Sequence, residues 1–295
     1  MTLGKNLITA LKGFAMGAGN VIPGCSAGTI ALLTGVFTPV IDALDAVASK
    51  DTWKALFKGD IKGFWEKING TFLVWLLGGA VISVLILAKL VTWALAHYPV
   101  HAWALSFGII AASTYFLLVP IKNWKLKDYL LLAIGVVLGV AFSLLSPTKT
   151  PDTDILVFLT GAVGVCAMIV PGLSGSLVLV LLGKYETIMS ALDVADLNWR
   201  VLIVFGLGCL IGLVAFSKLL HWLLDKHERE TLLVMIGFVL GALVKVWPWL
   251  HMDQINTANA AAGTPGALHI GASIAFCAIG AAIVIILETL ANKKK

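Results

Sequence analysis

The stretch that decides the fold reads Val21-Ile22-Pro23-Gly24-Cys25-Ser26-Ala27-Gly28-Thr29, and it returns as Ile169-Val170-Pro171-Gly172-Leu173-Ser174-Gly175-Ser176. Both copies lie in strongly apolar sequence and carry a Pro-Gly pair. Proline lacks a backbone donor and glycine adopts conformations that other residues avoid, so each copy predicts a broken helix. Hydroxyl-bearing and small residues follow each break.

The composition is typical of a membrane protein. Of the 295 residues, 59% are hydrophobic and only 13% are charged, whereas a soluble domain carries about 25% charged residues. Apolar runs of about 20 residues predict spanning helices. The net charge of +5 does not indicate a nucleic-acid partner, because the lysines lie mostly in short loops, where membrane topology explains them. Cysteines and histidines show no metal-ligand spacing, and no Walker or GxGxxG motif is present, so we expect neither a metal site nor nucleotide hydrolysis.

The two copies divide the chain into halves, residues 1–148 and 149–295. In the first half we expect a helical hairpin at 13–44, a surface amphipathic segment at 45–68, and spans at 70–96, 102–121 and 129–147. The segment 45–68 is interpreted as an amphipathic helix lying on the membrane surface, and an ordinary solvated loop is the alternative. In the second half we expect a hairpin at 155–192 and spans at 199–224, 231–249 and 269–288. The polar stretch 251–266 predicts a flexible exposed loop.

An internal duplication explains this plan. An offset of 148 residues aligns Pro23 with Pro171, together with their neighbours. After the lysine-rich segment the offset becomes 129, which aligns Lys89-Leu90 with Lys218-Leu219. Matches that keep one order along the chain predict two homologous repeats.

The lysines decide the topology. If each broken segment enters and leaves on one side, each half crosses three times and the halves are inverted. The cytoplasmic side then carries most basic residues, as the positive-inside rule requires: Lys5, Lys12, Lys50, Lys54, Lys58, Lys62, Lys67, Lys122, Lys125, Lys127, Lys226, Arg229 and the terminal Lys293–Lys295. Lys149 and Arg200 fall outside. We therefore predict an all-α polytopic protein of two inverted repeats. Each has one re-entrant hairpin and three transmembrane helices, and both termini are cytoplasmic.

Discontinuous helices in inverted repeats place a binding site near the membrane midplane. Two helix N-termini that converge there favour an anion such as phosphate or carboxylate. The predicted phosphate-binding residues are Gly24, Ser26, Gly28, Thr29, Gly172, Ser174, Gly175 and Ser176, with Pro23 and Pro171 breaking the helices. The alternative is that both Pro-Gly pairs only pack kinked helices.

Charged residues within or beside the spans form a second candidate set for gating, coupling or headgroup contact: Lys89, Lys184, Glu186, Arg200 and Lys218. Each has a simpler interpretation. Lysines near helix ends extend toward the interface, and the other members can anchor the chain there or stand at its rim.

The two quoted motifs resemble those of the polyprenyl-phosphate translocase family of bacterial inner membranes (PopT type), over essentially the whole chain. The matching residues are Pro23, Gly24, Ser26, Gly28 and Thr29, then Pro171, Gly172, Ser174, Gly175, Ser176, Tyr185 and Glu186. The first copy departs from the family pattern at Cys25, at Ala27, where glycine is expected, and at Phe37-Thr38, where Tyr-Glu is expected.

The resemblance implies a flippase that returns undecaprenyl phosphate across the inner membrane for cell-envelope synthesis. It implies no enzymatic activity and no cofactor; a proton or sodium gradient is the candidate driving force. Two alternatives stay open, a carrier or channel for a small soluble anion and a membrane-embedded lipid phosphatase or transferase. A lateral opening toward lipid favours the lipid substrate, and a sealed aqueous vestibule favours the small anion.

Overall fold

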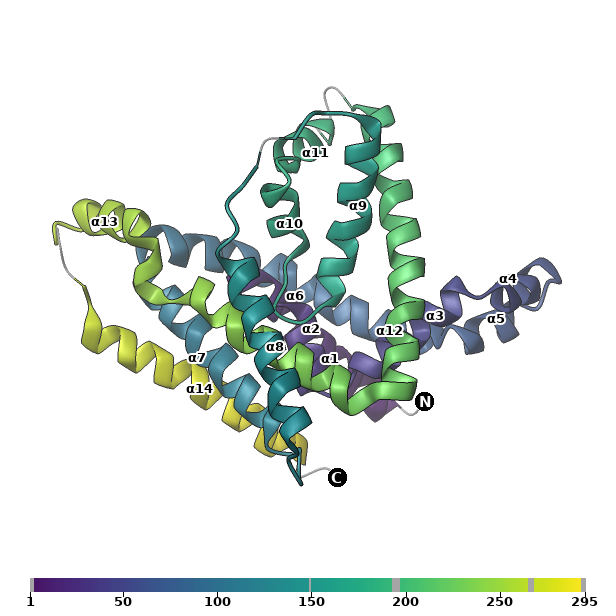
Figure 1. Cartoon of the computed structure of the whole chain (residues 1–295), viewed down its shortest axis with the longest axis horizontal. Coiled ribbons are helices and arrows are strands. Elements are labelled where there is room, and N and C mark those ends of the chain that lie inside the picture. Colours follow the sequence, from purple (N-terminus) through teal and green to yellow (C-terminus); the bar gives the residue numbers. More distant parts are fainter. Residues whose placement is uncertain (1–2, 149, 193–196, 265–267, 293–295) are drawn as a thin grey trace.

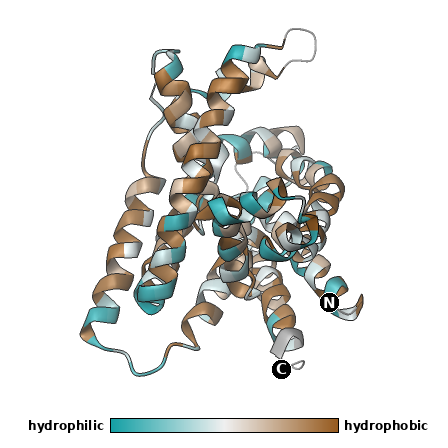
Figure 2. Cartoon of the chain, turned by 90° about the vertical axis from the view of Figure 1, so that its right-hand side faces the viewer, coloured by the Kyte–Doolittle hydropathy of each residue, from teal (hydrophilic) through white to brown (hydrophobic). Residues whose placement is uncertain are grey.

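A computed structural model of the chain describes residues 3–148, 150–192, 197–264 and 268–292, and all regular structure in these ranges is helical (Figure 1). Lys149 and Lys293–Lys295 lie outside them. Five described helices are long and apolar enough to cross a membrane, or six if one bent pair counts as a span. Hydrophobic residues cover the long helices, and hydrophilic residues gather toward helix ends and loops (Figure 2). The predicted class, an all-α polytopic membrane protein, is confirmed.

The first half contains α1 (Leu3–Val21), α2 (Ala27–Leu33), α3 (Phe37–Ala48), α4 (Lys50–Phe57), α5 (Ile61–Lys67), α6 (Gly70–His97), α7 (Pro99–Leu118) and α8 (Leu126–Ser143). The second half contains α9 (Asp154–Ile169), α10 (Gly175–Leu181), α11 (Tyr185–Ala191), α12 (Trp199–Ala242), two 3-10 turns at Leu243–Val246 and Pro248–His251, α13 (Met252–Ala261) and α14 (Ile270–Asn292). Each half thus opens with a broken helix pair before its long helices.

Both Pro-Gly pairs break a helix. Gly24 and Gly172 have φ of 76° and 83°, a left-handed conformation that strains any residue with a Cβ. The short helix after each break ends at another left-handed glycine, Gly35 in the first half and Gly183 in the second. The chain therefore turns at matching positions in both halves. The first broken segment begins earlier than the range 13–44, because α1 is helical from Leu3.

The longest helix contains a hidden boundary between two spans. Within α12, His227 has non-helical angles (φ −139°, ψ 43°). Tyr98, which separates α6 from α7, has almost the same angles (φ −136°, ψ 54°). The offset of 129 residues aligns these two positions. The two arms of α12 therefore correspond to α6 and α7.

Glycines of the last helix in each half make close backbone contacts at equivalent positions. Gly135 of α8 lies against the backbone of Val234 and Phe238 in α12, and Gly280 of α14 lies against Leu105 and Ile109 in α7. The contacted positions differ by 129 residues in both cases. Each half thus packs its last helix on the other half, with small residues allowing the close approach that helix association in lipid requires.

Two local expectations need correction. The stretch 251–266 is not an exposed loop throughout, because it contains α13, whose Ile255 is fully buried. Hydrophobic contact of this short helix with the bundle outweighs its polar composition. The amphipathic segment 45–68 is not one helix: α4 and α5 are separated by a turn in which Gly59 has φ of 80°. These two short helices extend away from the bundle (Figure 1).

Candidate functional site

The two Pro-Gly breaks meet inside the molecule. The backbone N–H of Gly172 donates hydrogen bonds to Ser26 Oγ at 2.8 Å and to Thr29 Oγ1 at 3.1 Å. A Cβ on Gly28 would lie 2.8 Å from the carbonyl oxygen of Ile169, so only glycine permits this approach. Residues more than 140 positions apart therefore form one junction, as the sequence predicted for the two tips.

The hydroxyls of the first tip are already engaged. Ser26 and Thr29 are 3% and 1% exposed, and their hydroxyl oxygens lie 3.1 Å apart. Ser26 Oγ also accepts from the backbone N–H of Thr29 and so caps α2. These hydroxyls hold the junction together in addition to any role toward a ligand.

The second tip differs. Ser174 occupies the cap position of α10 but makes no side-chain cap hydrogen bond. Its hydroxyl instead lies 2.7 Å from that of Ser176, which is exposed. Gly175 is buried against Met168 and Gly164 of α9. The second tip thus offers two neighbouring hydroxyls and an uncapped helix start.

A buried ammonium group closes the open end of the second hairpin. Lys184 is 0% exposed and donates to the carbonyl oxygen of Thr150 and to Asp152 Oδ1, both at 2.6 Å. Hydrogen bonds from Lys184 and then Thr187 hold the pKa of the Asp152 carboxyl below its ordinary value. These contacts join the segment before α9 to the segment after α10.

The other predicted charged residues do not gather at the junction. Lys89 and Lys218 are exposed, each four residues before an exposed tryptophan, at Trp93 and Trp222. Arg200 donates to Asp154 Oδ2 at 2.7 Å, on the first turn of α9. Glu186 is exposed at the start of α11. Their roles in gating, coupling or headgroup contact stay predictions.

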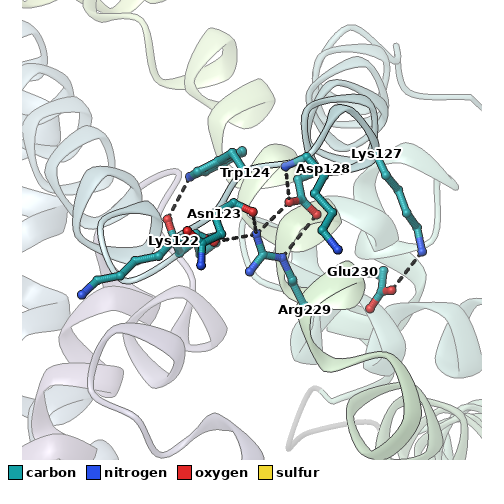
Figure 3. Close-up of polar contacts among 9 residues, drawn as sticks. Lys122, Asn123, Trp124, Lys127, Asp128, Arg229 and Glu230 are labelled. Atoms are coloured by element: carbon teal, nitrogen blue, oxygen red, sulfur yellow. Dashed lines mark hydrogen bonds and ion pairs between the residues drawn. The ribbon is translucent and has the colours of Figure 1, made fainter.

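An ion pair that the sequence analysis missed clamps one end of the bundle (Figure 3). Arg229 lies just after the kink in α12 and donates to Asp128 Oδ2 of α8 at 2.7 Å and to the carbonyl oxygen of Lys122 at 2.9 Å. Nearby, Lys127 and Glu230 pair at 2.9 Å. The available signal in the sequence was Asp128, a carboxylate at the start of an apolar run, which the structure buries. The clamp joins the loop between α7 and α8 to the kink.

A cavity of about 370 Å³ lies beside the first break. Its walls are Ile22 and Pro23, the last turns of α6, the first turns of α7, and Phe276 of α14. Trp93 and Tyr98 at its rim are about half exposed. The Nδ1 atom of His101 is buried in this wall without a hydrogen-bond partner. Sequence spacing could not find this cavity, because its walls come from both halves.

Comparison with known proteins identifies the family. Residues 16–263 match the family model described as undecaprenyl phosphate translocase-like. The chain belongs to this family. A protein of Vibrio cholerae named polyprenyl-phosphate transporter is 39% identical over 245 residues, which cover 82% of this chain and 78% of that protein. A protein of the same name from Staphylococcus aureus is 30% identical over 265 residues, covering 84% and 88%. No solved structure matches the chain. The resemblance inferred from the two motifs is confirmed.

Proposed function

We propose that this protein is a transporter, not an enzyme, that moves undecaprenyl phosphate across the bacterial inner membrane and so recycles the lipid carrier for cell-envelope synthesis. The junction of the two Pro-Gly tips is the observation that carries the proposal, because irregular backbone at membrane depth is tolerated only where it is buried or lines a cavity. The printed names of the two relatives support polyprenyl phosphate as the substrate.

The halves are inverted repeats, and each broken segment is a re-entrant hairpin. The contact of Lys184 with Asp152 supports this for the second half, since it brings the two ends of the hairpin together. The basic residues around the clamp, Lys122, Lys125, Lys127 and Arg229, support a cytoplasmic side at this end of the bundle. Both termini are then cytoplasmic.

The lipid phosphate binds at the junction of the tips. Ser174 and Ser176 donate hydroxyl hydrogen bonds, and the uncapped start of α10 adds backbone N–H groups. Ser26 and Thr29 fix the geometry by holding Gly172. Because water is scarce at this depth, hydrogen bonds to the phosphate replace its hydration shell.

The cavity beside the first break favours a lipid over a small soluble anion. Its walls are almost entirely apolar, and its rim residues lie on the hydrophobic surface of the bundle. A phosphatase or transferase would need an acid, base or nucleophile aligned with the phosphate. Among the described residues, the hydroxyls of Ser174 and Ser176 hydrogen-bond each other and not a histidine or carboxylate.

The decisive experiment measures undecaprenyl-phosphate transport in proteoliposomes with wild-type protein and with Ser174→Ala/Ser176→Ala. We expect at least about a tenfold loss for the double variant, since each hydrogen bond to a charged group contributes about 1.5–3 kcal/mol. Ser190→Ala, an exposed serine on α11, is the matched control. Unchanged transport by the double variant contradicts the phosphate site, and release of inorganic phosphate from the lipid supports the enzyme instead.

The driving force is tested in the same vesicles by imposing a proton or a sodium gradient. Glu186→Gln then removes the carboxylate at the start of α11. If protons couple through Glu186, this variant loses the response to the proton gradient and keeps downhill transport. A variant that responds like the wild type excludes this role for Glu186.

A further inference from the structure

The cavity beside the first break is a point at which the two repeats differ. It is lined by Val91, Ala94, Ala102 and Ser106 of α6 and α7, together with Pro23 and the aromatic rim. The offset of 129 residues aligns those four positions with Leu220, Leu223, Thr231 and Met235. Every one of the four residues is larger in the second half. At the other four lining positions of α6 and α7 the counterparts are not larger: Trp222, His227, Glu230 and Val234. The four larger side chains therefore narrow the matching site.

The matching site in the second half is also covered by α3. Phe37 and Ile41 of this helix, at 4% and 0% exposure, form one buried cluster with Leu220 and Met235. Asp42, also on α3, accepts a hydrogen bond across this contact, 3.0 Å from Nδ1 of His221. A helix of the first half therefore closes the position that corresponds to the cavity.

The equivalent helix of the second half, α11, does not cover the cavity in this way. Helix α11 aligns with the start of α3, but its Ile188 packs with Val157 and Leu179 of its own half. Tyr185, the mate of the buried Phe37, is 40% exposed. Helix α11 therefore leaves the cavity uncovered. The difference between the two repeats at this site arises from the lining residues and from the packing of α3 and α11 together.

We propose that this cavity binds the isoprenoid chain of the substrate next to its phosphate, with the lipid passing between α6 and α14 to the junction of the tips. This inference rests on the proposed function. A volume of about 370 Å³ lies within the range of about 300–1,000 Å³ usual for ligand pockets. The cavity adjoins Pro23, which lies three residues before Ser26 of the first tip.

The walls fit a branched, unsaturated chain. Trp93, Tyr98 and Phe276 present aromatic surfaces, and the ring of His101 lies 4.9 Å from that of Phe276. Because lipid tails are as apolar as these walls, transfer from the bilayer gains little hydrophobic free energy. Selectivity must therefore come from close packing around the methyl branches.

The first test measures competition with wild-type protein in proteoliposomes. Farnesyl phosphate shares both the phosphate and the isoprenoid chain, dioleoyl phosphatidic acid has a phosphate on straight acyl chains, and inorganic phosphate has no chain. We expect farnesyl phosphate to inhibit undecaprenyl-phosphate transport at about tenfold lower concentration than phosphatidic acid, and inorganic phosphate to inhibit least. Equal inhibition by the two lipids contradicts an isoprenoid site, while transport itself persists and leaves the proposed function standing.

The second test fills the cavity by introducing the residues that the second repeat carries at the equivalent positions. Ala94→Leu/Ser106→Met introduces the larger side chains that the second half carries at these positions. We expect the advantage of farnesyl phosphate over phosphatidic acid to fall at least about fivefold, because overpacking excludes the branched chain. The matched control is Ala96→Leu, which changes an exposed alanine on the same helix. Loss of the farnesyl preference in the filled variant alone supports the inference, and an unchanged preference overturns it; if the filled variant fails to fold, the competition test decides.

Discussion

The contact between the two tips predicts a strong coupling between Ser26 and Thr29. Both hydroxyls accept from the same N–H, that of Gly172. When one hydroxyl is removed, the other still satisfies this donor. When both are removed, the N–H has no acceptor in a region with little water. The two substitutions should therefore cost more together than the sum of their separate costs.

The magnitudes follow from the individual contacts. Ser26→Ala also removes the cap on Thr29 N–H and should destabilise by about 1 kcal/mol. Thr29→Val keeps the cap and the shape of the side chain, so we expect less than about 1 kcal/mol. The double variant leaves the Gly172 N–H unpaired, which adds about 1–3 kcal/mol. The bond between the two hydroxyls is lost once in the double variant but is counted twice in the sum, which subtracts about 0.5–1.5 kcal/mol. The net excess over the sum is therefore about 1 kcal/mol.

The assay is reversible unfolding in mixed detergent micelles, with a double-mutant cycle for Ser26→Ala and Thr29→Val. The control cycle combines Ser26→Ala with Thr114→Val, since Thr114 is equally buried but bonds only within its own helix, to the carbonyl oxygen of Ile110. The control pair should be additive within about 0.3–0.5 kcal/mol. Additivity of the Ser26 and Thr29 variants within the same limits would refute the shared hydrogen bond and with it the junction.

Three further predictions concern other parts of the fold. The pKa of Asp152 is lowered from 3.8, so its pair with Lys184 should stabilise the protein fully above pH 3.8. This stabilisation should be lost as the pH falls further and the carboxyl becomes protonated, so the melting temperatures of Asp152→Asn and of the wild type should converge in acid. Gly280→Ala should destabilise by about 1–3 kcal/mol because its Cβ would collide with the backbone of α7, whereas Gly78→Ala, which meets no atom within 4 Å, should be tolerated in chemical denaturation. Asp42→Asn should weaken the exposed contact between Asp42 and His221 by about 0.2–1 kcal/mol and raise the rate of amide hydrogen exchange in α3 by at most about fivefold. An unchanged exchange rate would show that this contact does not hold α3 in place.

Sequence patterns sufficed for features that depend on local chemistry or on the repeat. The Pro-Gly pairs predicted the breaks because proline and a left-handed glycine have few alternatives. The alignment of Tyr98 with His227 agreed with a boundary that the continuous helix α12 conceals. Membrane spans followed from apolar runs, since backbone groups in lipid must bond internally.

Features that depend on docking between distant elements could not be predicted. Ser26 and Ser174 occupy equivalent positions, yet Ser26 caps α2 and binds Gly172, whereas Ser174 bonds to Ser176. The local sequences differ, since Thr29 follows Ser26 by three positions and Ser176 follows Ser174 by two, but they do not show that Ser26 meets Gly172. The pairing of Arg229 with Asp128 likewise joins residues that are about 100 positions apart. Only the folded arrangement assigns these hydroxyls and charges their separate tasks.

The difference between the two motif copies at Phe37 and Tyr185 has a structural reason. Phe37 stands where the second copy has Tyr185, and it lies buried at the contact between α3 and the second half. A tyrosine hydroxyl there would need a hydrogen-bond partner within an apolar cluster. Because lipid is as apolar as the surface of α12, burying Phe37 and Ile41 against α12 gains little hydrophobic free energy. The energy that holds α3 in place must then reside in packing and in the Asp42–His221 contact, both modest terms.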